Sequence, residues 1–66
     1  MKINEFLKEK REDQGLKQNF VAEKLELKTN AMLSMFETGR VRWDFDRVEK
    51  YLNFLGYKIT IEKVEK

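Results

Sequence analysis

Residues 16–39 read LKQNFVAEKLELKTNAMLSMFETG, and this stretch decides the fold. Apolar residues recur in it at helical spacing twice, with a break between the two runs. The first run predicts a helix from Lys17 to about Leu25 that buries Ala22, Leu25 and either Phe20 or Val21. The second predicts a helix from about Asn30 to Thr38, capped by Thr29 or Asn30, that buries Leu33, Phe36 and either Ala31 or Met32. Gly39 ends it.

A further helix is expected on each side of this pair. The first runs from Ile3 to about Gln14, buries Ile3, Phe6, Leu7 and the stem of Lys10, and stops at Gly15. The last begins at Asp44, a good N-cap, and runs to about Leu55 before Gly56. Its apolar stripe consists of Phe45, Val48, Leu52 and Leu55, widened by Tyr51.

The last segment changes period, because Tyr57, Ile59 and Ile61 alternate with polar residues, as in a half-buried strand. A lone strand needs a partner for its backbone groups, and the chain contains no second alternating run. We therefore predict antiparallel pairing with the same strand of a second copy, with Tyr57, Ile59 and Ile61 as dimerisation residues. A frayed tail and an extension of the monomer core are the alternatives. The chain then divides into a helical domain, residues 1–56, and a dimerisation segment, residues 57–66.

Composition narrows the classes of function. The chain has 66 residues and neither cysteine nor histidine, so a disulfide or a zinc site is not expected to stabilise it, and a partner chain is the remaining means. Asp44 and Asp46 are better explained by helix capping than as a catalytic carboxylate pair. We expect no enzyme activity, no cofactor and no metal. No apolar run is long enough for a membrane span or a signal peptide, and the absence of cysteine fits a cytoplasmic location.

The net charge is only +2, but its distribution is uneven. Residues 1–16 and residues 43–66 are each neutral, so the whole excess of positive charge lies in residues 17–42. That segment is where a polyanion would be attracted. It is also the segment in which two short helices meet at a tight turn, the arrangement that reads DNA in helix-turn-helix proteins.

Residues 16–39 resemble the Cro/C1-type (XRE-family) helix-turn-helix proteins. The matching residues are Gln18, Ala22, Leu25, Leu33, Ser34, Phe36, Glu37 and Gly39. The C-terminal half is similar to the HipB-like antitoxins of that family, through Val48, Leu52, Leu55-Gly56-Tyr57 and Ile59-Thr60-Ile61. Together the resemblance covers about residues 3–62. It implies a mostly α fold of four to five helices, with one C-terminal β-strand that pairs across a homodimer.

The chain departs from the family in the turn between the two central helices. The distance from Ala22 to Leu33 is one residue longer than usual, and Glu26 stands where the family usually has glycine. We expect the longer turn to avoid the positive φ that makes glycine necessary.

The resemblance also implies which residues touch DNA. Base edges would be met by Asn30, Ala31, Ser34 and Met35. Asn30 can pair bidentately with adenine, and Ala31 and Met35 can pack on thymine methyl groups. Met32 is either a core or a groove residue. Phosphates would be met by Lys17, Gln18, Lys28, Thr29, Arg40 and Arg42. Glu37 is expected to be structural, tied to the following loop or to an arginine, and Trp43 to lie in the core.

The sequence thus predicts a sequence-specific regulator of transcription that binds double-stranded DNA as a homodimer on a palindromic operator. The resemblance favours an antitoxin-like repressor of its own operon, with a toxin protein as a further partner. The alternatives are a phage Cro/C1-like lysis–lysogeny regulator, and a protein-interaction module that no longer reads DNA. The interaction module is favoured by the apolar residues of the third helix, since they cannot all be buried on one helix face. These residues are Met32, Leu33, Met35 and Phe36.

Overall fold

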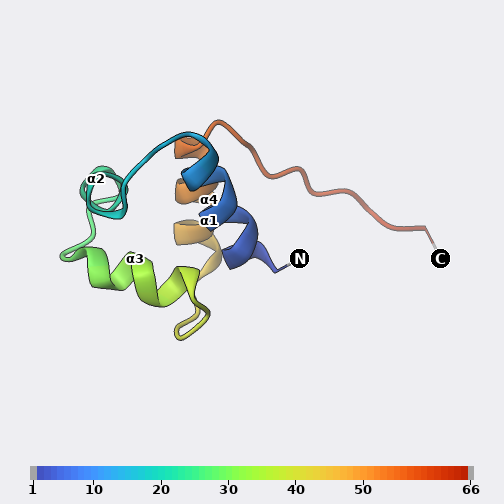
Figure 1. The fold of residues 1–66 in the computed structure, drawn as a ribbon. Helices are drawn as coiled ribbons and strands as arrows, with labels where there is room; N and C mark the ends of the chain where they lie inside the picture. The colour runs from blue at the N-terminus through green and yellow to red at the C-terminus, as the bar shows by residue number, and fades with distance from the viewer. Residues whose placement is uncertain (1, 66) are drawn as a thin grey trace.

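The computed structural model describes residues 2–65 and contains four helices in that range (Figure 1). They are α1 (Ile3–Asp13), α2 (Gln18–Lys24), α3 (Asn30–Glu37) and α4 (Phe45–Phe54). Each lies within one residue of the bounds expected from the sequence. The predicted mostly α helix-turn-helix architecture is therefore confirmed.

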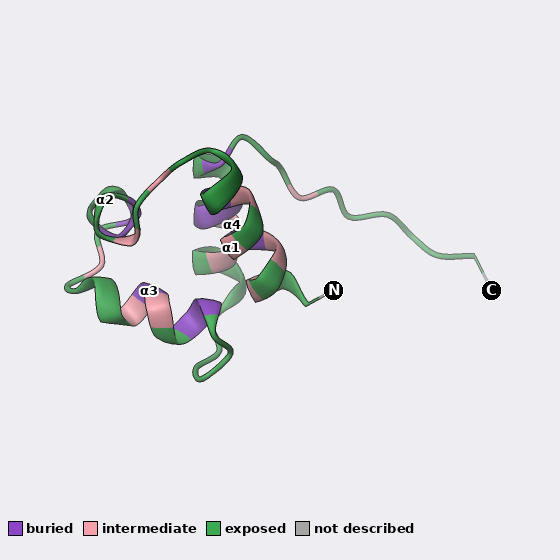
Figure 2. Ribbon diagram, viewed as in Figure 1, coloured by how far each residue is buried: buried purple, intermediate pink, exposed green. Residues whose placement is uncertain are grey.

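The core is built from all four helices, and buried residues face one another across it (Figure 2). It consists of Leu7, Val21, Ala22, Leu25, Leu33, Phe36, Tyr51, Leu52 and Leu55. Helix α3 packs against both α2 and α1. Gln14 links the C-terminal ends of α1 and α4, because its Nε2 donates to the carbonyl of Leu55 at 2.8 Å. The helix pair α2 and α3 therefore packs against α1 and α4.

Several sequence-based expectations about the core are resolved or corrected. Val21 is buried and Phe20 is exposed, while Ala31 is exposed and Met32 half-buried. The expected burial of Ile3 and Phe45 is wrong, since both are about half exposed. The reason is that the core lies against the middle and C-terminal turns of α1 and α4, whereas Ile3 and Phe45 are in their first turns.

The helix ends share one geometry. Gly15, Gly39 and Gly56 follow α1, α3 and α4 in the left-handed region, with φ of 71°, 83° and 97°. In each case the next N–H returns to a carbonyl five residues earlier, as Leu16 does to Arg11 at 3.1 Å. This pattern satisfies carbonyls that the last helical turn leaves free.

Helix α2 ends in the same way, but with Glu26 in place of glycine. The N–H of Leu27 donates to the carbonyl of Ala22 at 2.9 Å, and Glu26 has a φ of 61°. The expectation that the longer turn avoids a positive φ is therefore wrong. The left-handed position at the end of α2 is present, and the side chain of Glu26 occupies it.

Replacing this glutamate should stabilise the protein. Glu26→Gly removes a left-handed non-glycine residue, so the free energy of unfolding should rise by about 1 kcal/mol in urea titrations. The loss of the ion pair with Lys50 matters little, because both side chains are exposed and the Nζ–Oε1 distance is 3.8 Å. The matched control is Glu23→Gly inside α2, which should cost about 1 kcal/mol. Equal destabilisation by both substitutions would contradict the prediction.

The segment after α4 is extended and leaves the helices, as Figure 1 shows. Its first residues are anchored: the Tyr57 ring meets Phe6 edge-on with centroids 5.4 Å apart, and Ile59 packs partly buried against the core. Ile61 is 84% and Val64 76% exposed. Within residues 2–65 this segment pairs with no other strand. The strand expected from pairing with a second copy stays a prediction, and residue 66 of that segment lies outside the described residues.

No helix in the described range has the length and apolar character needed to cross a membrane.

Candidate nucleic-acid interface

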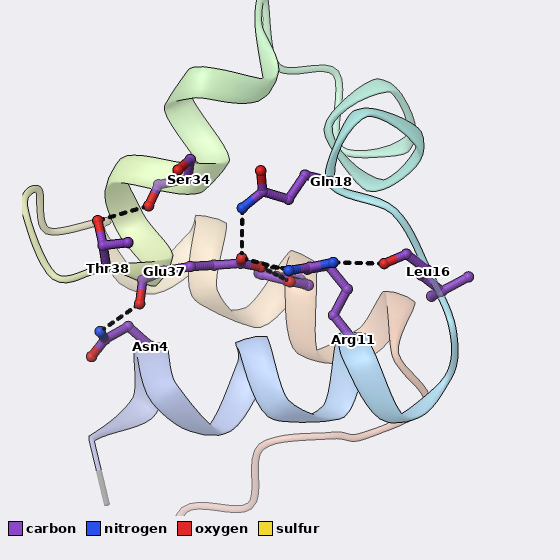
Figure 3. A network of polar contacts seen from close by, with 8 residues as sticks. Asn4, Arg11, Leu16, Gln18, Ser34, Glu37 and Thr38 are labelled. Atoms are coloured by element: carbon purple, nitrogen blue, oxygen red, sulfur yellow. Dashed lines mark hydrogen bonds and ion pairs between the residues drawn. The ribbon is translucent and has the colours of Figure 1, made fainter.

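The last turn of α3 carries a buried carboxylate, Glu37, which is 2% exposed. Arg11 of α1 donates to it twice, from Nε to Oε2 at 2.8 Å and from Nη2 to Oε1 at 3.0 Å. Gln18 of α2 donates from Nε2 to Oε1 at 3.0 Å (Figure 3). The Tyr51 hydroxyl of α4 donates to Oε2. One carboxylate therefore joins all four helices.

Further hydrogen bonds complete this network. Arg11 also donates from Nη1 to the carbonyl of Leu16 at 2.6 Å, which fixes the connection between α1 and α2. Asn4 donates to the backbone carbonyl of Glu37 at 3.1 Å. Every buried side-chain polar atom of the described residues has a partner. The C-terminal turn of α3 is consequently held from several sides at once.

The network decides the charge state of its members. Burial favours the neutral form of Glu37, but hydrogen bonds from Arg11, Tyr51 and Gln18 outweigh it and lower the pKa of the carboxyl group. The hydrogen bond to Glu37 raises the pKa of Arg11. Burial, together with the hydrogen bond to Glu37, raises the pKa of the Tyr51 hydroxyl. Glu37 and Arg11 are thus an ion pair, and Tyr51 is a neutral donor, across the neutral pH range.

Of the two structural roles expected for Glu37, the tie to an arginine is confirmed. The sequence did not identify Arg11 and Tyr51 as the partners of Glu37. Arg11 lies four residues after Leu7, on the buried face of α1, whereas Lys10 was expected there. Lys10 is half-buried, and its Nζ lies 3.8 Å from Oδ2 of Asp13. The sequence did contain a signal for Arg11, because it lies one helical turn after the core residue Leu7. Charged residues are rarely buried unless they are paired, so this position indicated a buried partner of opposite charge.

Breaking the ion pair from the arginine side should strongly destabilise the fold. Arg11→Met leaves the Glu37 carboxylate buried without its main partner, so the free energy of unfolding should fall by about 3–5 kcal/mol. Urea denaturation followed by circular dichroism measures the change. Lys10→Met, which removes a neighbouring charge from a partly exposed pair, should cost no more than about 1 kcal/mol. Similar losses for the two variants would show that the buried pair has no special role.

The low pKa of Glu37 predicts how stability depends on pH. The folded-state pKa lies below the unfolded value of about 4.3, so the charged Glu37 contributes fully to the free energy of unfolding above about pH 4.3. This contribution is lost as the pH falls through the folded-state pKa. NMR titration of the side-chain carboxyl carbon should therefore give a midpoint for Glu37 below the ordinary glutamate value of about 4.3. A midpoint above that value would contradict the assignment.

The outer face of α3 carries the residues predicted to read bases. Leu33, Phe36 and Glu37 form the buried face. Asn30, Ala31 and Met35 are exposed, and Ser34 is half-buried. Positions i, i+1, i+4 and i+5 share one side of a helix, so these four side chains lie together on α3. The backbone of Ser34 also accepts a hydrogen bond from the Thr38 hydroxyl at 2.9 Å.

The predicted phosphate contacts fall in three places around α3: at its N-terminal end, at the start of α2 and in the connection to α4. At the N-terminal end of α3, Lys28, Thr29 and Asn30 line a shallow hollow with Asn19 of α2. Thr29 is the N-cap residue of α3, although its side chain makes no capping hydrogen bond. Lys17 is exposed just before α2, next to Gln18, whose amide is already directed by Glu37.

At the other end of α3, Arg40 and Arg42 are exposed in the connection to α4. Trp43 closes this connection by stacking on Phe36, with ring centroids 4.2 Å apart and an interplanar angle of 10°. Trp43 is half-buried, so it borders the core that was expected to enclose it. The N-cap expected at Asp44 is confirmed, since Oδ1 accepts from the N–H of Arg47 at 2.9 Å.

A short helix pair whose second member presents an outward face, flanked by cationic residues, defines a helix-turn-helix DNA-binding domain. The family model described as Helix-turn-helix (HTH_3) matches residues 7–61. The chain therefore belongs to this helix-turn-helix family, and it is a DNA-binding transcription regulator of the XRE type. Searches of the curated proteins and of the solved structures returned no match.

Proposed function

We propose that this regulator is a homodimeric repressor that reads a palindromic operator through α3. The observation that carries the proposal is the division of α3 into two faces. One face is locked into the fold through Glu37, while Asn30, Ala31 and Met35 are free on the other. A helix that is held rigidly and exposed on one side is suited to the major groove.

The exposed residues suggest the bases that α3 prefers. The Asn30 amide has the donor and acceptor that pair bidentately with adenine. Ala31 and Met35 offer only apolar surface, which suits the methyl group of thymine. Together with Ser34 they favour an A·T-rich half-site.

The cationic and polar groups around α3 support binding to the DNA backbone. Six residues are proposed to contact phosphates: Lys17, Gln18, Lys28, Thr29, Arg40 and Arg42. Gln18 can take part because its Nε2 carries two hydrogens and donates only one of them to Glu37, which leaves the other for a phosphate oxygen. Such contacts fix the register of α3 on the duplex without carrying sequence information.

The C-terminal segment supports the dimer. Ile61 and Val64 are largely exposed on an extended chain whose backbone groups need partners. Antiparallel pairing of residues 57–62 with a second copy would meet that need, with Tyr57, Ile59 and Ile61 as dimerisation residues. Two recognition helices related by a two-fold axis would then lie about 34 Å apart, one turn of DNA.

An antitoxin-like role in the cytoplasm, with repression of its own operon and a toxin as a second partner, rests on the resemblance of residues 48–61 to HipB-like proteins. A toxin-like kinase gene beside this one would support it, and a phage gene cluster would instead favour a lysis–lysogeny regulator. A protein-interaction module that no longer reads DNA is the second candidate. It is favoured by Met35 and by the Phe20–Phe54 pair, whose exposed rings have centroids 6.2 Å apart.

Selection from a random DNA pool, combined with a mass measurement in solution, tests the proposal. We expect an A·T-rich palindrome bound by two chains, with an affinity that falls steeply as salt increases. Asn30→Ala should relax the preference at one base pair of each half-site and weaken binding by about 1–3 kcal/mol. Gel shifts on the selected sequence provide the measurement.

Two controls separate the parts of the proposal. Ile61→Asp changes a side chain that is 84% exposed in the single chain, so it should prevent the dimer without unfolding the helices. Lys58→Gln, in the same segment, should leave the dimer intact. A protein that stays a single chain at micromolar concentration, or selects no sequence, would exclude the dimeric repressor. Loss of cellular function in Met35→Asp but not in Asn30→Ala would favour the interaction module.

A further inference from the structure

A shallow groove of about 200 Å³ runs along one flank of α3, between this helix, the following loop and the first turn of α4. Its apolar lining consists of Met32, Met35, Val41 and Trp43, and its cationic lining of Arg42 and Arg47. Met32 lies about 200° around the helix from Asn30, since each residue turns the helix by about 100°. The groove is therefore on the opposite flank of α3 from the hollow that Asn30 shares with α2.

Arg47 was not among the residues that sequence reasoning connected with DNA, because it lies in α4, outside the helix-turn-helix stretch. Its backbone N–H is used by the Asp44 cap, but its side chain is exposed. Within residues 2–65 the guanidinium group forms neither a hydrogen bond nor an ion pair. Arg47 thus carries a positive charge without a partner in the described residues, beside the flank of α3.

We infer that Arg47 is a phosphate-binding residue and that, with Arg42, it holds the DNA strand on this side of α3. The inference rests on the proposed function, in which α3 enters the major groove. The major groove of DNA is about 12 Å wide, and a helix with its side chains is about 10–12 Å across. Both DNA strands that border the major groove therefore run close to the flanks of the helix. Lys17 and Gln18 face the strand on the α2 side, and Arg42 and Arg47 are left for the other.

The chemistry of the groove fits a phosphodiester backbone. A guanidinium group offers paired donors that match two phosphate oxygens. Met35 belongs both to this groove and to the outer face of α3, so the arginine pair is continuous with the surface that reads bases. An acidic protein would also be attracted to two arginines, but it would not need this continuity with α3.

The test compares Arg47→Gln with Lys24→Gln on the selected operator. Both variants lose one positive charge from an exposed side chain, but Lys24 lies over Phe20, which meets Phe54 in the last turn of α4, at the other end of that helix from Arg47. Arg47→Gln should weaken binding about tenfold near 0.1 M salt and reduce the magnitude of the salt slope by about 0.9. Lys24→Gln should leave both quantities close to those of the parent. Thermal melts should be unchanged, because the cap uses only the backbone of Arg47.

The base preference provides a second measurement. Since phosphate contacts carry no sequence information, Arg47→Gln should weaken binding to all sequences alike and leave the selected consensus unchanged. An affinity and salt slope equal to those of Lys24→Gln would overturn the inference while the proposed function stands. A preference altered at one base pair would also overturn it, because Arg47 would then read a base. If the parent protein selects no DNA, the proposed function fails and the inference fails with it.

Discussion

A carboxylate inside a protein keeps its charge only where donors replace the water it has lost, and the arrangement around Glu37 meets that condition. Arg11, Gln18 and Tyr51 approach it from three different helices. A shift of any one of these helices would remove at least one donor from the buried charge. In a chain of 66 residues, where apolar burial alone is modest, this requirement gives the helices one relative placement.

That placement gives α3 its two roles. Its inner face, with Leu33, Phe36 and Glu37, belongs to the core, and its outer face is left for a ligand. The same network reaches the proposed DNA surface through Gln18, which donates to Glu37 at the first turn of α2. Structural support and the orientation of a phosphate-binding group thus depend on one carboxylate.

The turn and the tail show where the chain departs from the most stable solution. Glu26 occupies a left-handed position that Gly15, Gly39 and Gly56 fill at the other helix ends. The tail exposes Ile61 and Val64, which a protein of this size can hardly leave uncovered without cost. The first feature costs local backbone energy, and the second is consistent with the dimer that we propose.

The amino-acid sequence by itself determined the helices and their ends, because helical periodicity, cap residues and glycines act locally. It also indicated the helix-turn-helix class, through the spacing of the two central helices and the resemblance of residues 16–39, whereas the outward set on α3 was implied by the resemblance alone. Only the tertiary structure decided that Arg11, and not Lys10, lies inside, and that Tyr51 meets Glu37. These contacts join residues 26 and 14 positions apart, and no local pattern specifies them. The placement of Arg47 beside α3 depends in the same way on how α4 packs, and this is decided by the shared core rather than by any one segment.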